Sequence, residues 1–335
     1  MRLLRCLLSV AALSWASADF AAAAAMLENF DYPYPVQRFD FTSQKQPLSM
    51  AYLDVAPEGQ ANGRTVVALH GKNFCAATWE TTIRALVKAG YRVIAPDQIG
   101  FCKSSKPDRY QFGLHQLAAN THALLQQLGI SKAVIMGHSM GGMLAFRYAL
   151  MYPQETEALV AVNPLGFEDW KAEGVPVVTI DQLYEGELKT TAQSIRGYQL
   201  DTYYGGVWRP VYDRWVEMLA SMYDGEGKQA VAWNQALTSD MVFMQPVLYE
   251  FPAIKVPTLL LVGAQDNTAI GKNRAPDAVK KRIGNYKELA PLAASRIPGA
   301  RLVMFPDLGH SPQVQAPDRF NEALIAELEK ALAGR

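Results

Sequence analysis

The sequence predicts an α/β fold in which helices cover both faces of a mostly parallel eight-stranded sheet. Short, continuous apolar runs, typical of strands buried on both faces, alternate with segments of helical spacing. The links between them are short and often contain Gly or Pro. The interval 164–252 has no strand-like run of comparable strength and is rich in aromatic residues, which indicates a helical cap inserted after the sixth strand.

The strands and helices follow from these patterns in chain order. The expected strands are 36–41, 48–55, 65–69, 91–95, 133–136, 158–162, 258–262 and 301–305. The expected helices are 79–89, 114–128, 140–151 and 317–332. The first two of these helices stop at a glycine, which favours a helix end. The core is therefore expected to comprise 36–163 and 253–335, with the cap or lid at 164–252.

The N-terminal segment has the pattern of a secretory signal peptide. Two arginines lie within 1–5, an apolar run follows at 6–13, and small residues stand at 16–18. We expect a signal peptide over 1–18, with cleavage within 21–25 as the alternative. The apolar run is too short to span a membrane, so we expect no stable membrane insertion after cleavage. The expected location is the periplasm or the cell exterior.

Composition narrows the class of partner. The 335 residues include 32 Lys and Arg against 32 Asp and Glu, so the formal net charge is zero. Nucleic-acid-binding proteins usually carry a basic excess, so we expect no nucleic acid and favour a small, largely uncharged molecule. Three cysteines exclude a disulfide-rich scaffold and argue against a multi-cysteine zinc site. The sequence leaves the oligomeric state open.

The segment 137–142, Gly-His-Ser-Met-Gly-Gly, stands between an expected strand and an expected helix. This is the G-x-S-x-G pattern in the strand–turn–helix context that it requires, and it predicts Ser139 as a nucleophile. The sharp turn needs small neighbours, which Gly137 and Gly141 supply. The amide of Met140, at the start of the helix, is placed to face a developing oxyanion.

With this turn and four further motifs, the chain resembles, over roughly 36–332, the lidded serine hydrolases of the α/β-hydrolase fold that include esterases and lipases. The motifs are His-Gly-Lys-Asn at 70–73, Asp-Gln-Ile-Gly at 97–100, Gly-Ala-Gln-Asp at 263–266 and Leu-Gly-His at 308–310. The stretch 97–107 is similar to a loop of haloalkane dehalogenases and epoxide hydrolases. Those relatives attack with an Asp at the turn, whereas this chain has Ser139, which argues for acyl-type hydrolysis.

The resemblance implies a Ser-His-Asp triad. His310 matches the position of the base, and Asp266 matches that of the acid which orients it. Their 44-residue separation (310 − 266) is long, and 269–297 looks like an insertion that accounts for it. Glu168 and Asp169 remain alternative acids. The oxyanion donors implied are the backbone amides of Met140 and Lys72.

Several residues are candidates for the substrate pocket. His70 is expected to orient the oxyanion loop, and Trp208 and Trp233 either roof a pocket or form the core of the cap. The side chains of Lys72 and Asn73 either point outward or contact a polar group of the substrate. The loops that carry Cys75 and Cys102 are adjacent in this fold, and export would permit a disulfide between them.

We expect a serine hydrolase that cleaves a small or medium, largely uncharged carboxylic ester, with no metal and no organic cofactor. The same triad can also cleave a carbon–carbon bond, an amide or a peptide, or make peracids. Aminopeptidases of the family capture a substrate amine with acidic groups, for which the cap offers Asp181, Glu185 and Glu187. A non-catalytic ligand receptor on the same fold is the alternative from another class.

Overall fold

The computed structural model describes residues 26–333, so the predicted signal peptide lies outside the described residues. Eight strands form one sheet in the order β1-β2-β4-β3-β5-β6-β7-β8. Their bounds are β1 Val36–Ser43, β2 Gln46–Val55, β3 Thr65–Leu69, β4 Arg92–Pro96, β5 Ala133–His138, β6 Thr156–Val162, β7 Thr258–Gly263 and β8 Arg301–Phe305. All eight predicted strands are confirmed, with ends that differ by at most two residues.

The sheet is mostly parallel. Strand β2 runs antiparallel to both β1 and β4, whereas the pairs from β4 to β8 are parallel. Every residue of β3, β5 and β7 is buried, which explains why these strands appear in the sequence as unbroken apolar runs. Strand β5 lies between β3 and β6, so the turn after it opens near the middle of the sheet.

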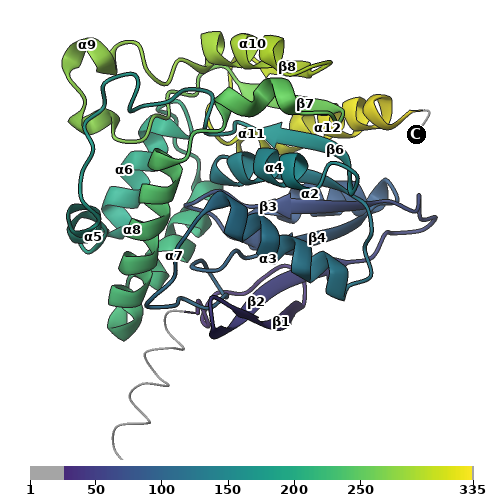
Figure 1. The fold of residues 1–335 in the computed structure, drawn as a ribbon, viewed down its shortest axis with the longest axis horizontal. Helices are drawn as coiled ribbons and strands as arrows, with labels where there is room; N and C mark the ends of the chain where they lie inside the picture. Colours follow the sequence, from purple (N-terminus) through teal and green to yellow (C-terminus); the bar gives the residue numbers. More distant parts are fainter. Residues whose placement is uncertain (1–25, 334–335) are drawn as a thin grey trace, which may run out of the picture.

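Helices cover both faces of the sheet (Figure 1). One apolar core joins the sheet to α2 (Glu80–Lys88) and α12 (Pro317–Leu332). The other core lies under α3 (Leu114–Gln127), α4 (Met140–Met151) and α10 (Tyr286–Arg296). All four predicted helices are confirmed.

The interval between β6 and β7 contains helices and no strand among its residues, all of which the structure describes. The predicted helical cap after strand six is therefore confirmed. Its helices are α5 Ile180–Glu187, α6 Ala192–Thr202, α7 Asp213–Met222 and α8 Lys228–Met244, and they lie together at one end of the sheet (Figure 1). Thr179 and Thr191 begin α5 and α6 with capping boxes, which satisfy the first amides of these short helices.

Short helical segments complete the chain. They are η1 Ala76–Trp79, η2 Pro210–Tyr212, η3 Gly225–Gly227, η4 Leu248–Ala253, η5 Lys272–Arg274, α9 Asp277–Lys280 and α11 Pro312–Gln315. The stretch 269–297 contains η5, α9 and α10, and α10 packs against β7 and β8. Within residues 26–333, no helix has the length and apolar character that crossing a membrane requires.

Candidate active site

Ser139 occupies the sharp turn between β5 and α4. Its backbone has φ 57° and ψ −120°, a conformation that non-glycine residues rarely adopt and that is typical of functional turns. A Cβ added at Gly137 would lie 1.9 Å from the carbonyl oxygen of Gly141, and one at Gly141 would lie 2.3 Å from that of Leu69. Both neighbours are backbone atoms, so only glycine permits this turn at these positions.

The turn is also held by backbone hydrogen bonds. The amide of Ser139 donates to the carbonyl of Val162 on β6 at 3.1 Å, and its own carbonyl accepts from Gly142 and Leu165. Met140 is the first residue of α4, so its amide has no acceptor within the helix. This free donor at the positive end of a 12-residue helix suits a developing negative charge beside Ser139.

A buried hydrogen-bonded pair joins the loops after β7 and β8. Nδ1 of His310 lies 2.7 Å from Oδ2 of Asp266, and both side chains are fully buried. The carboxylate also accepts from the Asn163 side chain at 2.9 Å and from the Thr268 amide at 2.9 Å. Because these donors fix the carboxylate, Nδ1 of His310 is held as the protonated nitrogen and Nε2 is left to accept a proton.

Asn163 is a further residue that binds the Asp266 carboxylate, and sequence reasoning missed it. It follows β6 directly and adopts φ 36°. Besides bonding Asp266, its side-chain oxygen accepts from the amide of Gly263 at 2.9 Å. A polar residue immediately after a buried parallel strand was a usable signal, because sites in such sheets form at the carboxyl ends of strands.

The alternative acids lie elsewhere. Glu168 accepts from the Trp170 indole and from the Gly284 amide, both below 3 Å, and burial raises the pKa of its carboxyl. Asp169 accepts from the amide of Lys171. The Nδ1 bond of His310 goes to Asp266 and to neither of these residues.

His138, within the turn, bears on His310 directly. Its Nε2 lies 2.8 Å from the carbonyl oxygen of His310, which attaches the loop that carries His310 to the turn that carries Ser139. Burial, together with the nearby His310, holds the pKa of His138 well below its ordinary value. His138 is therefore neutral at neutral pH, with its Nε2–H donating to that carbonyl.

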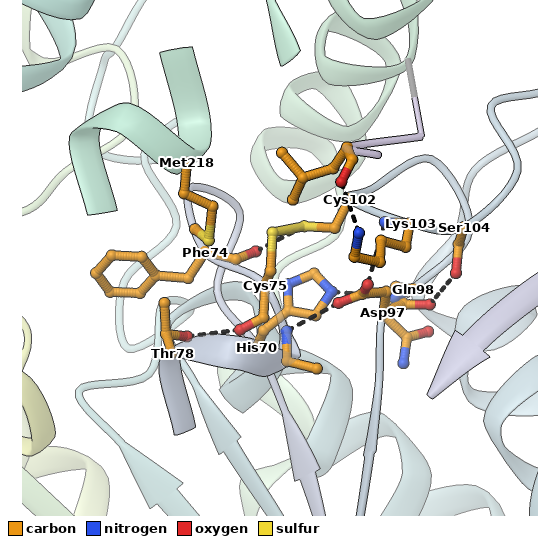
Figure 2. Close-up of a disulfide and its surroundings, with 12 residues drawn as sticks. His70, Phe74, Cys75, Thr78, Asp97, Gln98, Cys102, Lys103, Ser104 and Met218 are labelled. Carbon is orange, nitrogen blue, oxygen red and sulfur yellow. Dashed lines mark hydrogen bonds between the residues drawn. A yellow bond between two sulfur atoms is a disulfide. The ribbon is translucent and has the colours of Figure 1, made fainter. Parts of the chain in front are cut away.

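Residues of the loop after β4 hold the loop after β3 in place. The carboxylate of Asp97 accepts from the amides of Ala76, at 2.8 Å, and Lys103, at 3.1 Å. A disulfide joins Cys75 and Cys102, whose Cα atoms are 5.8 Å apart, beside Asp97 and His70 (Figure 2). The hypothesis of a bridge between these cysteines is confirmed, and it anchors the loop that carries Lys72.

His70 serves this same loop and does not form part of a pocket wall. Its Nε2 accepts from the Gln98 amide at 3.0 Å, which places its proton on Nδ1, 2.8 Å from the Gly71 carbonyl. The ring is 1% exposed, and burial lowers its pKa. The expectation that His70 orients the oxyanion loop agrees with this placement, whereas its proposed contact with substrate does not.

A cavity of about 250 Å³ opens above Ser139. Its walls combine residues of the loop after β3, of the cap and of the loop after β7. They are Lys72, Asn73, Ser139, Leu165, Glu187, Thr190, Ser194, Ile195, Tyr198, Tyr203, Leu219, Tyr223, Ser239, Thr268 and Ile270. Lys72 and Asn73 therefore face the cavity, and the alternative in which both point outward is wrong.

Two cap tryptophans expected at the pocket lie outside this wall. Trp208 packs edge-on against Tyr204 and donates its indole N–H to Asp213 at 2.9 Å. Trp233 donates to the carbonyl of Asp108 at 2.9 Å. Both tryptophans therefore serve to pack and anchor the cap. Composition alone does not tell which aromatic side chains of a segment face a cavity.

Three tyrosines line the cavity, and Tyr203, which follows α6, packs against His310. Its ring centroid lies 4.7 Å from that of His310, and its hydroxyl accepts from the Asn73 side chain at 3.0 Å. Tyr203 thus connects the cap to His310 and to the loop after β3. Burial raises the pKa of its phenol well above the ordinary value, so the hydroxyl stays protonated.

Only one group of three metal-binding side chains gathers among the described residues, namely Cys75, Asp97 and Cys102. The two sulfurs are bonded to each other, whereas a metal ligand must be a free thiolate. Asp97, moreover, already accepts from the surrounding amides. This group stabilises the two loops and offers no argument for a metal.

Comparisons with known proteins agree with this geometry. A family model described as alpha/beta hydrolase fold matches residues 64–317. A solved structure of a probable hydrolytic enzyme from Pseudomonas aeruginosa PAO1 is 63% identical, with a TM-score of 0.90, and the match covers 91% of this chain and 97% of that one.

Curated relatives include enzymes of several activities. Lipase 1 of Psychrobacter immobilis is 27% identical over 78% of this chain and 76% of its own. A 2-hydroxy-6-oxo-6-phenylhexa-2,4-dienoate hydrolase of Burkholderia cepacia is 29% identical over 85% of this chain and 93% of its own. An AB hydrolase superfamily protein, a haloalkane dehalogenase and an epoxide hydrolase match over 39%, 50% and 35% of their own lengths. The chain belongs to the alpha/beta hydrolase family, and it is a hydrolase.

Proposed function

We propose that the protein is a serine hydrolase that cleaves a small or medium, largely uncharged carboxylic ester through an acyl-enzyme. The observation that carries the proposal is the position of Ser139, which lines the cavity from a strained turn. The buried pair of His310 and Asp266 is attached to that turn through a hydrogen bond of His138. Esterase and lipase relatives support the same reaction class.

The proposed reaction begins with proton transfer. Nε2 of His310 has no hydrogen-bond partner among residues 26–333, so it is available to take the proton of the Ser139 hydroxyl as that oxygen attacks the carbonyl carbon. Asp266 stabilises the imidazolium that forms, and the amides of Met140 and Lys72 hold the oxyanion. His310 returns the proton to the leaving alcohol.

Water completes the cycle. It attacks the acyl-enzyme while His310 takes its proton, and the second tetrahedral intermediate releases the carboxylic acid and restores Ser139. Each step moves a proton between groups of the chain and the substrate, so the sequence needs no redox partner. The cavity of about 250 Å³ favours a compact acyl compound.

Carbon–carbon cleavage is the second candidate reaction. It is favoured by the similarity to the hydrolase of Burkholderia cepacia named above, which extends over 93% of that protein. A vinylogous diketone would present a carbonyl to the same serine and oxyanion donors. We rank it below ester cleavage because the solved structures of similar fold include several esterases.

Steady-state kinetics on p-nitrophenyl acetate, butyrate and octanoate test the proposal. We expect turnover by the wild type, with a preference for the shorter chains. Ser139→Ala and His310→Gln should each lower kcat by about 10⁴-fold or more, and Asp266→Asn by about 10⁴-fold. Turnover of a ring-fission diketone without ester cleavage would transfer the assignment to the second candidate.

We also propose that the protein is exported to the periplasm or beyond. The buried Cys75–Cys102 bridge supports export, because structural disulfides persist in oxidising compartments. Fractionation of cells that express the full-length chain, followed by N-terminal sequencing, should show a processed product outside the cytoplasm. Full-length protein confined to the cytoplasm would contradict the proposal.

A further inference from the structure

Of the fifteen residues that line the cavity, two are charged, and they form a pair. Nζ of Lys72, on the loop after β3, lies 2.8 Å from Oε1 of Glu187 at the end of α5. Their side chains are 15% and 17% exposed. The other oxygen of Glu187 accepts from the hydroxyl of Tyr223 at 2.6 Å. This Lys72–Glu187–Tyr223 group bridges the loop next to Ser139 and the cap.

The pair keeps unused hydrogen-bonding capacity that faces the cavity. An ammonium carries three N–H donors, and Lys72 uses one of them among the described residues. A carboxylate accepts about four hydrogen bonds, and Glu187 accepts two here. Burial and the charge of Glu187 raise the pKa of Tyr223 well above its ordinary value, so this phenol stays protonated and donates to Glu187.

A charged group of a substrate would meet an obstacle at this wall. A carboxylate that accepted from the free donors of Lys72 would lie beside the negative charge of Glu187, and an ammonium that donated to Glu187 would lie beside the positive charge of Lys72. Either placement brings like charges together beside side chains that are only 15% and 17% exposed, which is costly. A hydroxyl or an amide, in contrast, donates to Glu187 and accepts from Lys72 while the pair stays intact.

We propose that the Lys72–Glu187 pair is the specificity site of the enzyme, which binds an uncharged hydrogen-bonding group of the substrate and disfavours carboxylates and ammonium groups. The inference rests on the proposed ester hydrolysis and specifies its substrate class as hydroxylated or amide-bearing neutral esters. It also argues against the amine-capture role considered for Glu187, because Lys72 already neutralises that carboxylate.

Matched esters test this. One series varies the acyl part, as methyl butyrate, methyl 3-hydroxybutyrate, monomethyl succinate and methyl 3-aminopropanoate. The other series varies the alcohol part and comprises the butyrates of ethanol (plain), ethylene glycol (hydroxylated), glycolic acid (anionic) and choline (cationic). In at least one series, the wild type should give the hydroxylated ester the highest kcat/KM and the two charged esters the lowest.

Two substitutions should redirect the preference. Glu187→Gln leaves Lys72 without its counter-charge, so the ratio of anionic to plain ester kcat/KM should rise by about tenfold, the effect of one modest charge interaction. Lys72→Gln should raise the ratio of cationic to plain ester by a similar factor. The control is Glu173→Gln, whose carboxylate pairs with the exposed Arg282 outside the cavity, and it should change neither ratio.

A double variant protects the test against misfolding of the single ones. Lys72→Gln with Glu187→Gln buries no unpaired charge, and it should bring the kcat/KM of the hydroxylated and plain esters close to each other. Ratios that equal those of the wild type in the folded variants, or a wild type that prefers a charged ester, would overturn the inference.

The two proposals fail in different ways. If the wild type cleaves no ester, the proposed function fails. The preference of the specificity site is then measured as the rate at which phosphonates that carry the same four substituents modify Ser139. The expected order and shifts are the same as for the esters. Equal modification rates across the substituents and variants would contradict the inference even in that case.

Discussion

Removing the bridge between Cys75 and Cys102 should destabilise the protein more than it should impair catalysis. The bridge closes a loop with a sequence separation of 27 residues. In the chain-entropy model the loss is 2.1 plus 1.5R ln 27, or about 12 cal/mol/K, which is about 3.6 kcal/mol at 25 °C. Both side chains are buried, at 0% and 1% exposure, so Cys75→Ala with Cys102→Ala avoids burying hydroxyls.

Catalysis should change only a few-fold, because Asp97 connects the same two loops through the amides of Ala76 and Lys103. The assay is urea unfolding of the wild type and of the double variant, each with and without reductant, alongside ester turnover. Reductant should bring the wild type toward the variant and should leave the variant unchanged. Equal free energies of unfolding in all four samples, or alkylation of Cys75 and Cys102 in the unfolded, unreduced wild type, would refute the reasoning.

Further predictions concern the turn, the histidines and the acid. Gly141→Ala would place a Cβ 2.3 Å from a backbone oxygen, so it should abolish soluble expression or lower the free energy of unfolding by more than about 3 kcal/mol. The matched control is Gly197→Ala in α6, where a Cβ would have nothing within 4 Å. In the same urea assay this variant should be more stable by about 0.5–1 kcal/mol. The pKa of His138 is lower in the folded protein than in the unfolded chain, so the unfolded state binds more protons below about pH 6.5. The free energy of unfolding should therefore fall on acidification, by up to about 1.4 kcal/mol per pH unit. His138→Gln should flatten this slope, and an unchanged slope would contradict the assignment. Asn163→Ala removes a 2.9 Å bond to the Asp266 carboxylate, so kcat should drop about tenfold with little change in KM, and a change in KM alone would argue against a positioning role.

The framework of the site could be predicted because its signals are local. The burial of β3, β5 and β7 on both faces produces unbroken apolar runs, and the turn at Ser139 requires glycines at fixed offsets. His310 and Asp266 follow strands at the carboxyl edge of the sheet, so chain order and the family pattern located them. These features depend on a few neighbouring residues.

The polar wall of the cavity could not be predicted, because it depends on how the cap folds over the sheet. Lys72 and Glu187 are 115 residues apart, and Asn73 and Tyr203 are 130 apart. Nothing in the sequence near Glu187 distinguishes it from Asp181 or Glu185, which do not line the cavity. For the same reason, the sequence could not decide whether Trp208 and Trp233 line a pocket or pack within the cap.

The measurement that tests the account most directly is the intact mass of the folded protein after reaction with a fluorophosphonate. The account predicts one adduct per chain, located by peptide mapping on Ser139, and a rate of modification that falls strongly in His310→Gln. Ser139→Ala should gain no adduct. An unmodified folded wild type, or an adduct on a residue other than Ser139, would contradict the assignment of Ser139 as the nucleophile.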